Sequence, residues 1–432
     1  MTRRAWWLVF SNLLIPGLGP LLAGNKRFGR LALRIWLSVV FALLVIVVLA
    51  LVLRGPLLFV LTTATGLGVL KWLVLAYGMW MLVTMIETIR QTQLIRVDAF
   101  ARGLVLVVAV ILGTIPAFVG IFGWAQVGMA QSAVQRIFAD EHAGLKMPAN
   151  GRINIMLLGA DRGEGREGSR PDSISVMSFD AMSGRLVTVG LPRVLHGFGF
   201  AEGPMRDMYG DDYSYCNVDV CYLNSVYTEV ETHDYDMYPD AEAQGSERGI
   251  EATRDAVEWI TGLDIHYYVL VDMAGFATLI DAMGGVEIDV KERVGLGIND
   301  DGTNPNWEPP SVYIEPGKQV LDGEMALWYA RSRYQTTDYA RMERQRDLQD
   351  AVISQLPSKI PSRGAQIIDA LDDVVQTDIP PGQAGIIVDL ALKSRGRDDN
   401  ERVQLSPPLV DPEAEVIDYD AARTEIDSAI GR

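Results

Sequence analysis

Long apolar stretches dominate the first 125 residues of the chain. Residues 32–53 contain one charge near their start and residues 104–125 contain none. Each stretch is long enough to cross the roughly 30 Å hydrocarbon layer of a membrane as a helix. The apolar segment 56–85, interrupted by Lys71, exceeds one crossing, so we predict an interfacial stretch before a crossing at about 66–87. The pattern therefore predicts three crossings, at 35–53, 66–87 and 104–125.

A shorter apolar segment, residues 6–24, is interrupted by Pro16 and Pro20 and has basic residues on both sides. This arrangement favours a re-entrant or interfacial hairpin, and a full crossing is the alternative. Clusters of Lys and Arg lie at 3–4, 26–34 and 90–102. They predict the cytoplasmic side of the membrane, which leaves the chain after residue 126 outside. The apolar segments recur and no small-residue cleavage site follows the first, so we expect no cleavable signal peptide.

From residue 151 onward, strand-like and helix-like patterns alternate, and this alternation predicts a layered α/β domain. The segment 197–245 is rich in Gly, Asp and Tyr and resembles a long loop or insertion. The expected strands are 153–158, 173–179, 185–191, 266–272 and 286–290. The expected helices are 249–261, 273–283, 322–329, 338–355, 362–371 and 382–394.

These patterns divide the chain into four parts. We predict a multi-pass transmembrane region at 1–125, a stalk and linker at 126–150, an extracytoplasmic α/β domain at 151–395 and a polar acidic tail at 396–432. Residues 1–130 contain 11 Lys or Arg and two acidic residues, a net charge of +9. Residues 131–432 contain 27 basic and 53 acidic residues, a net charge of −26. So acidic a domain repels a phosphate backbone, which argues against nucleic-acid binding.

The chain has two cysteines, Cys216 and Cys221. Their spacing allows a local disulfide, which agrees with an exported domain in an oxidising compartment, and two free or metal-binding thiols are the alternative. The four histidines are scattered, with no HExxH spacing and no Cys/His cluster. A zinc site is therefore not expected.

Two aspartates lie at the ends of neighbouring predicted strands. Asp161 follows the strand 153–158, and Asp172 precedes the strand 173–179. If a glycine-rich loop joins these strands, both carboxylates lie at one edge of the sheet. Two such oxygen ligands suit Mg²⁺, which takes one or two protein carboxylates and fills its other positions with water and phosphate. The alternative is that both aspartates cap turns.

A second group of polar residues follows the predicted helix 322–329. If residues 330–334 are extended, Arg331 and Arg333 point to one side, and if the chain is helical from 338, Asp338, Arg341 and Gln345 share a face. Arginine forks bind phosphate oxygens in pairs and stay charged, so the grouping suits a pyrophosphate. Arg193, after the strand 185–191, is a candidate to join them. An ion-pair network with the many acidic residues is the alternative.

At these residues the chain resembles the LytR-CpsA-Psr family of cell-wall glycopolymer ligases. The resemblance covers about residues 151–357 and rests on four ordered motifs. They are LLGADR with RPDS, GLPR at 190–193, DMAGFATLIDAMGGVEIDV at 272–290, and ALWYARSRYQTTDYARMERQRDL at 326–348, the most specific of the four. The resemblance implies a layered α-β-α domain with a central mixed sheet, outside the cell and preceded by a membrane region. It also implies a hydrophobic pocket for the lipid of a polyprenyl-pyrophosphate-linked glycan, which is transferred to peptidoglycan.

The resemblance also implies roles for individual residues. Asp161 and Asp172 match metal ligands for Mg²⁺, or Mn²⁺ in its place, and either Asp172 or Asp338 is implied to assist deprotonation of the incoming hydroxyl. The residues that match pyrophosphate ligands are Arg170, Arg193, Arg331, Arg333, Arg341 and Gln345, of which Arg193 and Arg341 also match catalytic positions. Val194 replaces the aspartate that commonly follows Pro-Arg in the family. A hydrolase acting on the same lipid, or a non-catalytic binder or regulator of envelope assembly, are the competing hypotheses.

Overall fold

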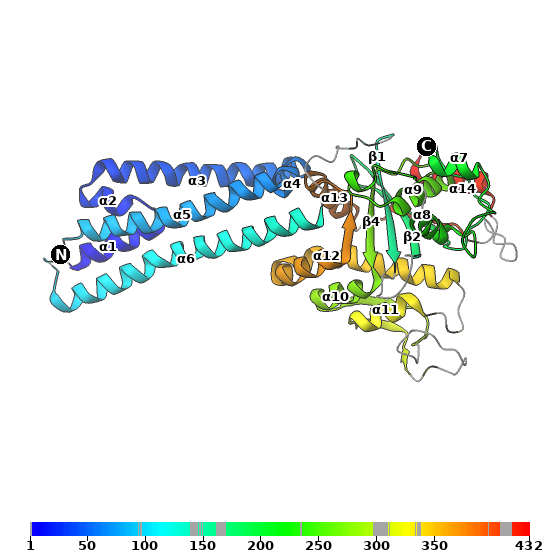
Figure 1. The fold of residues 1–432 in the computed structure, drawn as a ribbon. Coiled ribbons are helices and arrows are strands. Elements are labelled where there is room, and N and C mark those ends of the chain that lie inside the picture. Colours follow the sequence, from blue (N-terminus) through cyan, green and yellow to red (C-terminus); the bar gives the residue numbers. More distant parts are fainter. Residues whose placement is uncertain are drawn as a thin grey trace. The chain divides into compact units, whose positions relative to one another are not determined.

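The structure of the chain is a computed structural model. It describes residues 2–93, 95, 97–138, 146, 148, 150–160, 170–233, 236–296, 310, 312–332, 334, 338–395, 397–406 and 417–432. The chain divides into two compact units, Met1–Val134 and Gln135–Arg432. The first unit is helical and the second contains the β-sheet (Figure 1).

The first unit contains helices that match the predicted membrane region. Its elements are α1 (Thr2–Leu14), α2 (Leu18–Ala23), α3 (Lys26–Val52), α4 (Arg54–Thr62), α5 (Ala64–Gln91) and α6 (Ala99–Ile137). Among the described residues, three helices are long and apolar enough to cross a membrane: Lys26–Val52, Ala64–Gln91 and Ala99–Arg136. They contain the three predicted crossings. The segment 6–24 folds as α1 and α2, which a turn at Gly17 separates. The last long helix continues beyond residue 126 to Ile137, into the segment predicted as a stalk.

Glycines allow α5 and α6 to pack closely. A Cβ atom on Gly78 of α5 would lie 2.7 Å from the carbonyl oxygen of Pro116 and 2.9 Å from the Cα of Gly120, both in α6. Close packing through small residues is a common means of helix association in membranes. Lys71 places its ammonium group 4.6 Å from the ring centre of Trp124. A cation over an aromatic ring is an attractive contact, and this one joins α5 to α6.

The second unit is built on a mixed sheet, as predicted, and this sheet has six strands. Its strand order is β10-β3-β2-β1-β4-β9. The strands are β1 (Arg152–Ala160), β2 (Pro171–Asp180), β3 (Leu186–Leu191), β4 (Tyr267–Asp272), β9 (Val375–Thr377) and β10 (Glu401–Gln404). The pairs β1–β4 and β3–β10 are parallel, and the pairs β1–β2, β2–β3 and β4–β9 are antiparallel. Consequently the ends of β1, β3, β4 and β10 and the start of β2 meet at one edge.

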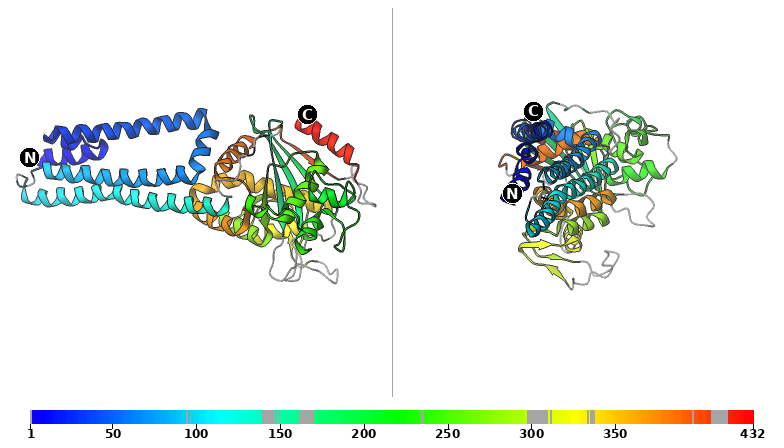
Figure 2. Two further views of the ribbon diagram at one scale, coloured as in Figure 1. Left: turned by 45° about the horizontal axis from the view of Figure 1, so that its top comes forward. Right: turned by 90° about the vertical axis from the view of Figure 1, so that its left-hand side faces the viewer.

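Helices cover both faces of the sheet (Figures 1 and 2). We call the face with α8, α9 and α14 the α9 face, and the face with α10, α11, α12 and α13 the α12 face. The α9-face helices are Val226–Thr232, Arg248–Thr261 and Tyr419–Ile430. The α12-face helices are Met273–Met283, Gly323–Arg331, Asp338–Val374 and Pro381–Ser394. Short elements complete the unit: α7 (Pro204–Tyr209), η2 (Leu223–Ser225), η3 (Glu242–Gln244), and the paired strands β5 (Val286–Val290) with β8 (Gly317–Leu321) and β6 (Val294–Gly295) with β7 (Tyr313–Ile314).

Strand alternation produces these two faces. In β1, Met156 and Leu158 belong to the core that includes α9, whereas Ile153 and Ile155 belong to a core with residues of α13. Successive side chains of a strand point to opposite sides, so a strand covered on both faces is apolar at nearly every position. This explains why 153–158 was recognisable as a buried strand.

Three predictions about this unit need correction. Residues 396–432 are not a loose tail: β10 extends the sheet beside β3, and α14 buries Ala422, Ile426 and Ala429. Backbone hydrogen bonds form β10 and need no apolar composition, and three apolar side chains on one helical face bury α14. The helix α12 is continuous from Asp338 to Val374, although 338–355 and 362–371 were expected to be separate. Packing of α12 in the core with α10 outweighs the local cost of its prolines. The segment 197–245 contains short helices.

Candidate functional site

The common edge of the strands brings Asp172 and Arg193 together. Asp172 is the second residue of β2, and Arg193 lies two residues after β3 ends. Because β2 and β3 are antiparallel neighbours, the start of one adjoins the end of the other. The guanidinium of Arg193 donates from Nη1 to Oδ1 of Asp172, and the two side chains remain 20% and 29% exposed. The pair is therefore accessible to a ligand.

The first turns of α12 lie beside this pair. Four residues at helical spacing, Met342, Gln345, Arg346 and Gln349, line a small polar cavity of about 10 Å³. From the sheet, the same cavity is lined by Asp172, Ser173, Ile174, Ser175 and Leu191. We call it the polar cavity. It joins the predicted residues Asp172 and Gln345 in one place, although they are far apart in the sequence.

A larger apolar cavity of about 220 Å³ adjoins the polar one. Ser173, Gln345 and Gln349 line both. The remaining lining residues are Leu157, Leu158 and Gly159 of β1, Met177 of β2, Val271 of β4, Met273, Phe276 and Leu279 of α10, Leu327 and Ala330 of α11, and Leu348, Val352 and Ile353 of α12. Such a cavity, almost wholly apolar with a polar group at one end, suits part of a ligand with an apolar chain and a charged head.

Arg344 and Gln345 fix the end of α11 against α12. Arg344 donates from Nε to the carbonyl oxygen of Tyr329, at 2.9 Å, and from Nη2 to that of Ser332. Gln345 donates from Nε2 to the carbonyl oxygen of Ala330, at 3.3 Å. Basic side chains commonly satisfy the last carbonyls of a helix in this way. Burial lowers the pKa of Arg344. Through its two hydrogen bonds to carbonyl oxygens, Arg344 holds the C-terminal end of α11 in place.

The other predicted residues have different surroundings. Arg331 is the last residue of α11, so the alternation argument for an extended segment does not apply to it. The helix is longer than predicted because the backbone N–H of Ser332 still bonds to the carbonyl of Trp328. Arg341 is only 3% exposed on α12, whereas Arg170 is exposed just before β2. Asp338 begins α12, but its side chain is not described, and Asp161 and Arg333 lie outside the described residues.

The polar cavity is lined by oxygen atoms, which are the ligands that a hard cation prefers. Asp172 and Ser173 bring oxygen atoms to the polar cavity. Oxygen ligands of this kind are those that Mg²⁺ accepts. Within the described part of the chain, no group of three or more His, Cys, Asp or Glu residues lies close enough together to hold a metal ion. The second predicted ligand, Asp161, is not among the residues described.

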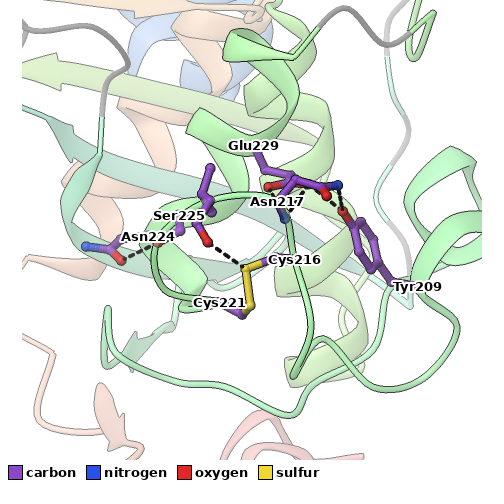
Figure 3. The surroundings of a disulfide bond; sticks show 8 residues. Tyr209, Cys216, Asn217, Cys221, Asn224, Ser225 and Glu229 are labelled. Carbon is purple, nitrogen blue, oxygen red and sulfur yellow. Dashed lines mark hydrogen bonds between the residues drawn. A yellow bond between two sulfur atoms is a disulfide. The ribbon is translucent and has the colours of Figure 1, made fainter.

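A disulfide lies close to Asn217, Asn224 and Glu229 (Figure 3). Cys216 and Cys221 are bonded, with their Cα atoms 5.6 Å apart, as the first of the two alternatives for these thiols expected. Next to the disulfide, the backbone N–H of Asn217 donates to Oε2 of Glu229 at 3.1 Å. Three residues after Cys221, the backbone N–H of Asn224 donates to the carbonyl oxygen of Arg193 at 3.0 Å. A covalent closure of this loop thus limits the motion of a neighbour of Arg193.

Ser175 and Arg346 are among the residues of the polar cavity that were not predicted. The signal for Arg346 was present, since positions 342, 345, 346 and 349 follow the i, i+3, i+4, i+7 spacing of one helical face. The predicted face, drawn through Asp338, Arg341 and Gln345, shares only Gln345 with the face that lines the cavity. Ser175 gave no signal, because a serine within an apolar strand has no distinguishing pattern.

Comparison with known proteins identifies the family. The LytR_cpsA_psr family model matches residues 127–427. The polyisoprenyl-teichoic acid–peptidoglycan teichoic acid transferase TagU of Enterococcus faecalis is 31% identical over 33% of this chain and 47% of its own length. The regulatory protein MsrR of Staphylococcus aureus is 27% identical over 58% of this chain and 63% of its own length. The chain thus spans about half the length of these curated relatives.

Among solved structures, B. subtilis TagV is 20% identical, with a TM-score of 0.46, and the match covers 66% of this chain and 99% of that one. The family match extends over more than half of the chain and includes the whole described sheet, together with both cavities. It also reaches into α14, which was not expected to belong to the domain. The chain therefore belongs to the LytR-CpsA-Psr family.

Proposed function

We propose that this protein transfers a glycopolymer from a polyprenyl-pyrophosphate carrier to peptidoglycan at the outer face of the membrane. The observation that carries the proposal is the junction of the two cavities. An apolar cavity of about 220 Å³ meets a polar cavity lined by Asp172, Gln345 and Arg346, with Arg193 beside Asp172. A prenyl chain attached to a diphosphate has the same two-part character. The name of the Enterococcus faecalis relative, a transferase acting between teichoic acid and peptidoglycan, supports the same reaction.

The reaction that we infer is a phosphoryl transfer. A peptidoglycan hydroxyl oxygen forms a bond to the sugar-linked phosphorus, and the bond from that phosphorus to the bridging oxygen breaks. Prenyl phosphate leaves with the electron pair, and the proton of the hydroxyl passes to a base, for which Asp172 and Asp338 remain the two candidates. Guanidinium groups next to the phosphates stabilise charge on the oxygens, where such reactions need it.

Of the predicted diphosphate ligands, Gln345 lines both cavities and Arg193 contacts Asp172 beside them, and Arg341, buried on α12, remains a candidate from the sequence. Arg193 already binds one carboxylate oxygen of Asp172, an arrangement in which a phosphate oxygen is an equivalent partner. Arg331, Arg170 and Arg333 remain further candidates from the sequence. We propose that Asp172 and Asp161 hold Mg²⁺ or Mn²⁺, which when bound would neutralise part of the diphosphate charge.

The chain's other features suit a membrane-bound donor and an external acceptor. Three helices are able to cross a membrane, and they would keep the protein next to its lipid substrate. The disulfide and the basic clusters at the membrane region support an extracytoplasmic catalytic domain. Membrane lipid, the lipid-linked glycan and peptidoglycan are the partners that this placement implies.

The test uses the full chain in lipid nanodiscs, a labelled prenyl-diphosphate glycan, peptidoglycan fragments and Mg²⁺. The wild-type protein should move label to the fragments. Asp172→Ala and Arg341→Ala should each lower the rate on the order of 10² to 10³, as removal of a preorganised charged group does. Arg185→Gln, which removes an exposed pair with Glu401 far from the cavities, is the matched control.

The products distinguish the competing functions. Release of free glycan phosphate in the presence of acceptor would identify a hydrolase. Donor binding without turnover, together with unchanged behaviour of Asp172→Ala, would identify a binder or regulator. Either result contradicts the transferase proposal.

A further inference from the structure

Two buried hydrogen-bond donors of the polar cavity have no partner among the described residues. They are the Nε–H of Arg346 and the hydroxyl of Ser175, whose residues are 5% and 2% exposed. Buried polar groups are nearly always hydrogen-bonded, so two such groups in one place need an explanation. Both line the cavity that also contains Asp172.

The surroundings of Arg346 fix its guanidinium group at this place. Nη1 donates to Oε1 of Gln404 on β10 at 2.7 Å. The group lies against Gly190 of β3, where a Cβ atom would stand 1.0 Å from Nη2. Any other residue at position 190 would therefore displace it. No described carboxylate lies within ion-pair distance of Arg346, and the pKa falls to about 10 because burial disfavours the charge and Arg402 repels it. At neutral pH the group is still a cation.

The order of the two cavities across the sheet indicates which part of a ligand reaches Arg346. The apolar cavity is lined by β1, β4 and α10, and the polar cavity by the start of β2 and the end of β3. In the sheet, β2 and β3 lie on one side of β1 and β4 on the other. If the prenyl chain occupies the apolar cavity, the first phosphate lies near Ser173, and the second phosphate, which bears the sugar, lies toward β3 and Arg346.

Resting on the transferase function, we propose that the polar cavity is an oxyanion pocket for the sugar-linked phosphate. Arg346 and Ser175 donate hydrogen bonds to one of its two non-bridging oxygens, and Gly190 and Gln404 position Arg346. The cavity's volume of about 10 Å³ suits one oxygen atom, since about 10–15 Å³ is the least that holds a water. It is too small for a whole phosphate, and this makes the pocket selective between the two oxygens.

This selectivity supplies the experiment. In two diastereomeric donors, sulfur replaces one or the other non-bridging oxygen of the sugar-linked phosphorus. Because sulfur is larger than oxygen, the diastereomer that directs sulfur into the pocket should react more slowly with the wild-type chain, by on the order of 10-fold or more. The full chain in nanodiscs with peptidoglycan fragments is used, and initial rates are compared.

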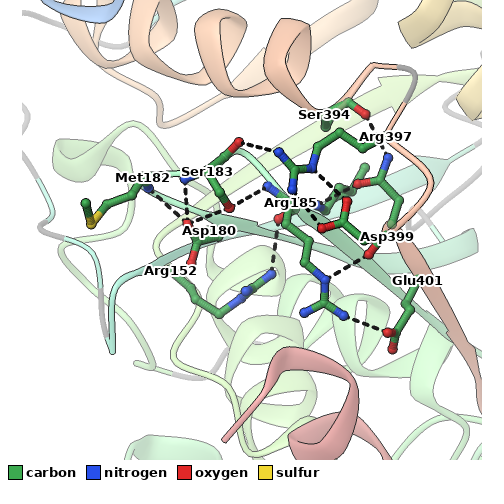
Figure 4. Close-up of polar contacts among 11 residues, drawn as sticks. Arg152, Asp180, Met182, Ser183, Arg185, Ser394, Arg397, Asp399 and Glu401 are labelled. Carbon is green, nitrogen blue, oxygen red and sulfur yellow. Dashed lines mark hydrogen bonds and ion pairs between the residues drawn. The ribbon is translucent and has the colours of Figure 1, made fainter.

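Variants test whether this preference depends on the two hydrogen-bond donors, Ser175 and Arg346. Ser175→Ala enlarges the pocket and removes one hydrogen-bond donor. It should therefore lower the rate of transfer from the all-oxygen glycan donor and bring the rates of the two sulfur diastereomers closer together. Arg346→Gln should lower the rate on the order of 10² to 10³, and Arg346→Lys should restore part of it. Ser183→Ala and Arg185→Gln are the matched controls. They belong to a polar cluster around Arg152, Asp180 and Arg397 near the opposite end of β3 (Figure 4), where hydrogen bonds join the residues to one another.

The outcomes are distinct. Equal rates for the two diastereomers would overturn the pocket, as would a preference that Ser175→Ala leaves unchanged, because a water molecule would then explain the unpaired donors. If the wild-type chain transfers nothing from the ordinary donor, the proposed function itself fails. In that case the relative binding of the two diastereomers to the wild-type chain, with and without Ser175→Ala, still decides on the pocket.

Discussion

Buried arginine side chains on the two faces of the central sheet have different partners. On the α9 face, Arg254 is nearly buried, and its Nη2 lies 2.8 Å from Asp378 and 3.3 Å from Glu251. On the α12 face, Arg346 is equally buried but has the amide of Gln404 in place of a described carboxylate. Burial lowers the pKa of both guanidinium groups. At Arg254 the two carboxylates more than compensate, so that its pKa is raised, whereas that of Arg346 falls to about 10.

We infer from this difference that the buried charge of Arg254 stabilises the fold, whereas the buried charge of Arg346 serves to bind a ligand. A buried ion pair that also accepts a backbone hydrogen bond, as Asp378 does from the N–H of Tyr268 at 2.8 Å, is complete within the protein. A buried cation beside a cavity is completed only by a ligand. The α9 face is a continuous core, and both cavities of the candidate site lie on the α12 face.

The largest effect should come from breaking the ion pair between Arg254 and Asp378. Asp378→Asn keeps an oxygen that accepts from Tyr268, but it leaves Glu251 as the remaining ion-pair partner of Arg254 and also removes the pair between Asp378 and Lys146. We expect a loss of about 3 kcal/mol in the free energy of unfolding, at the low end for a broken buried pair. Pulse proteolysis of the full chain in nanodiscs measures it. The rate of transfer per folded molecule should not change.

The matched variant on the other face is Arg346→Met. Because it removes a buried cation that has no described carboxylate partner, stability should be unchanged or higher although transfer is lost. Equal destabilisation by Asp378→Asn and Arg346→Met would remove the distinction between the two faces.

A smaller effect is expected from filling space on each face. Ala330 lines the apolar cavity, and Ala256 is fully buried in the α9-face core. Ala330→Phe should leave stability nearly unchanged but weaken binding of a prenyl-diphosphate lipid about 10-fold, by occupying the room of its chain. Ala256→Phe should instead cost about 1–3 kcal/mol through overpacking. Lipid binding and unfolding are measured for both, and a stability loss with Ala330→Phe would mean that the cavity is not open space.

The sequence predicted the parts that periodicity encodes. The strand at 153–158 follows from a run of apolar residues that ends at Gly159, because a strand covered on both faces is apolar throughout. The strand at 286–290 follows from alternation, and the helix at 273–283 from helical spacing before two glycines. Periodicity did not predict β10 and α14. Backbone pairing is enough to form β10, and three apolar side chains are enough to bury α14. At the site, Asp172 was predicted because strand ends meet at an edge, and Arg193 because it follows a predicted strand and suits a phosphate together with the other arginines. Ser175 and the unpaired state of Arg346 depend on which side chains happen to surround them, which no local pattern records.

The smallest effect concerns pH and stays on the α9 face. The hydroxyl of Tyr238 donates to Asp255, and burial, with Glu258 and Glu251 nearby, raises the pKa of Asp255 to about 7 despite that hydrogen bond and the charge of Arg254. The folded state therefore holds a proton that the unfolded chain loses near pH 4. Stability from this group is present below pH 4 and is lost as the pH rises to 7.

Asp255→Asn removes this titration, so the variant should lose less stability than the wild type between pH 5 and pH 8, measured by the same proteolysis. The transfer rate per folded molecule should keep the wild-type pH profile, because Asp255 lies on the face without the cavities. Parallel stability profiles for the two proteins would show that Asp255 titrates normally. A shifted transfer profile would show that charge on the α9 face reaches the site, and the separation between the two faces would then be wrong.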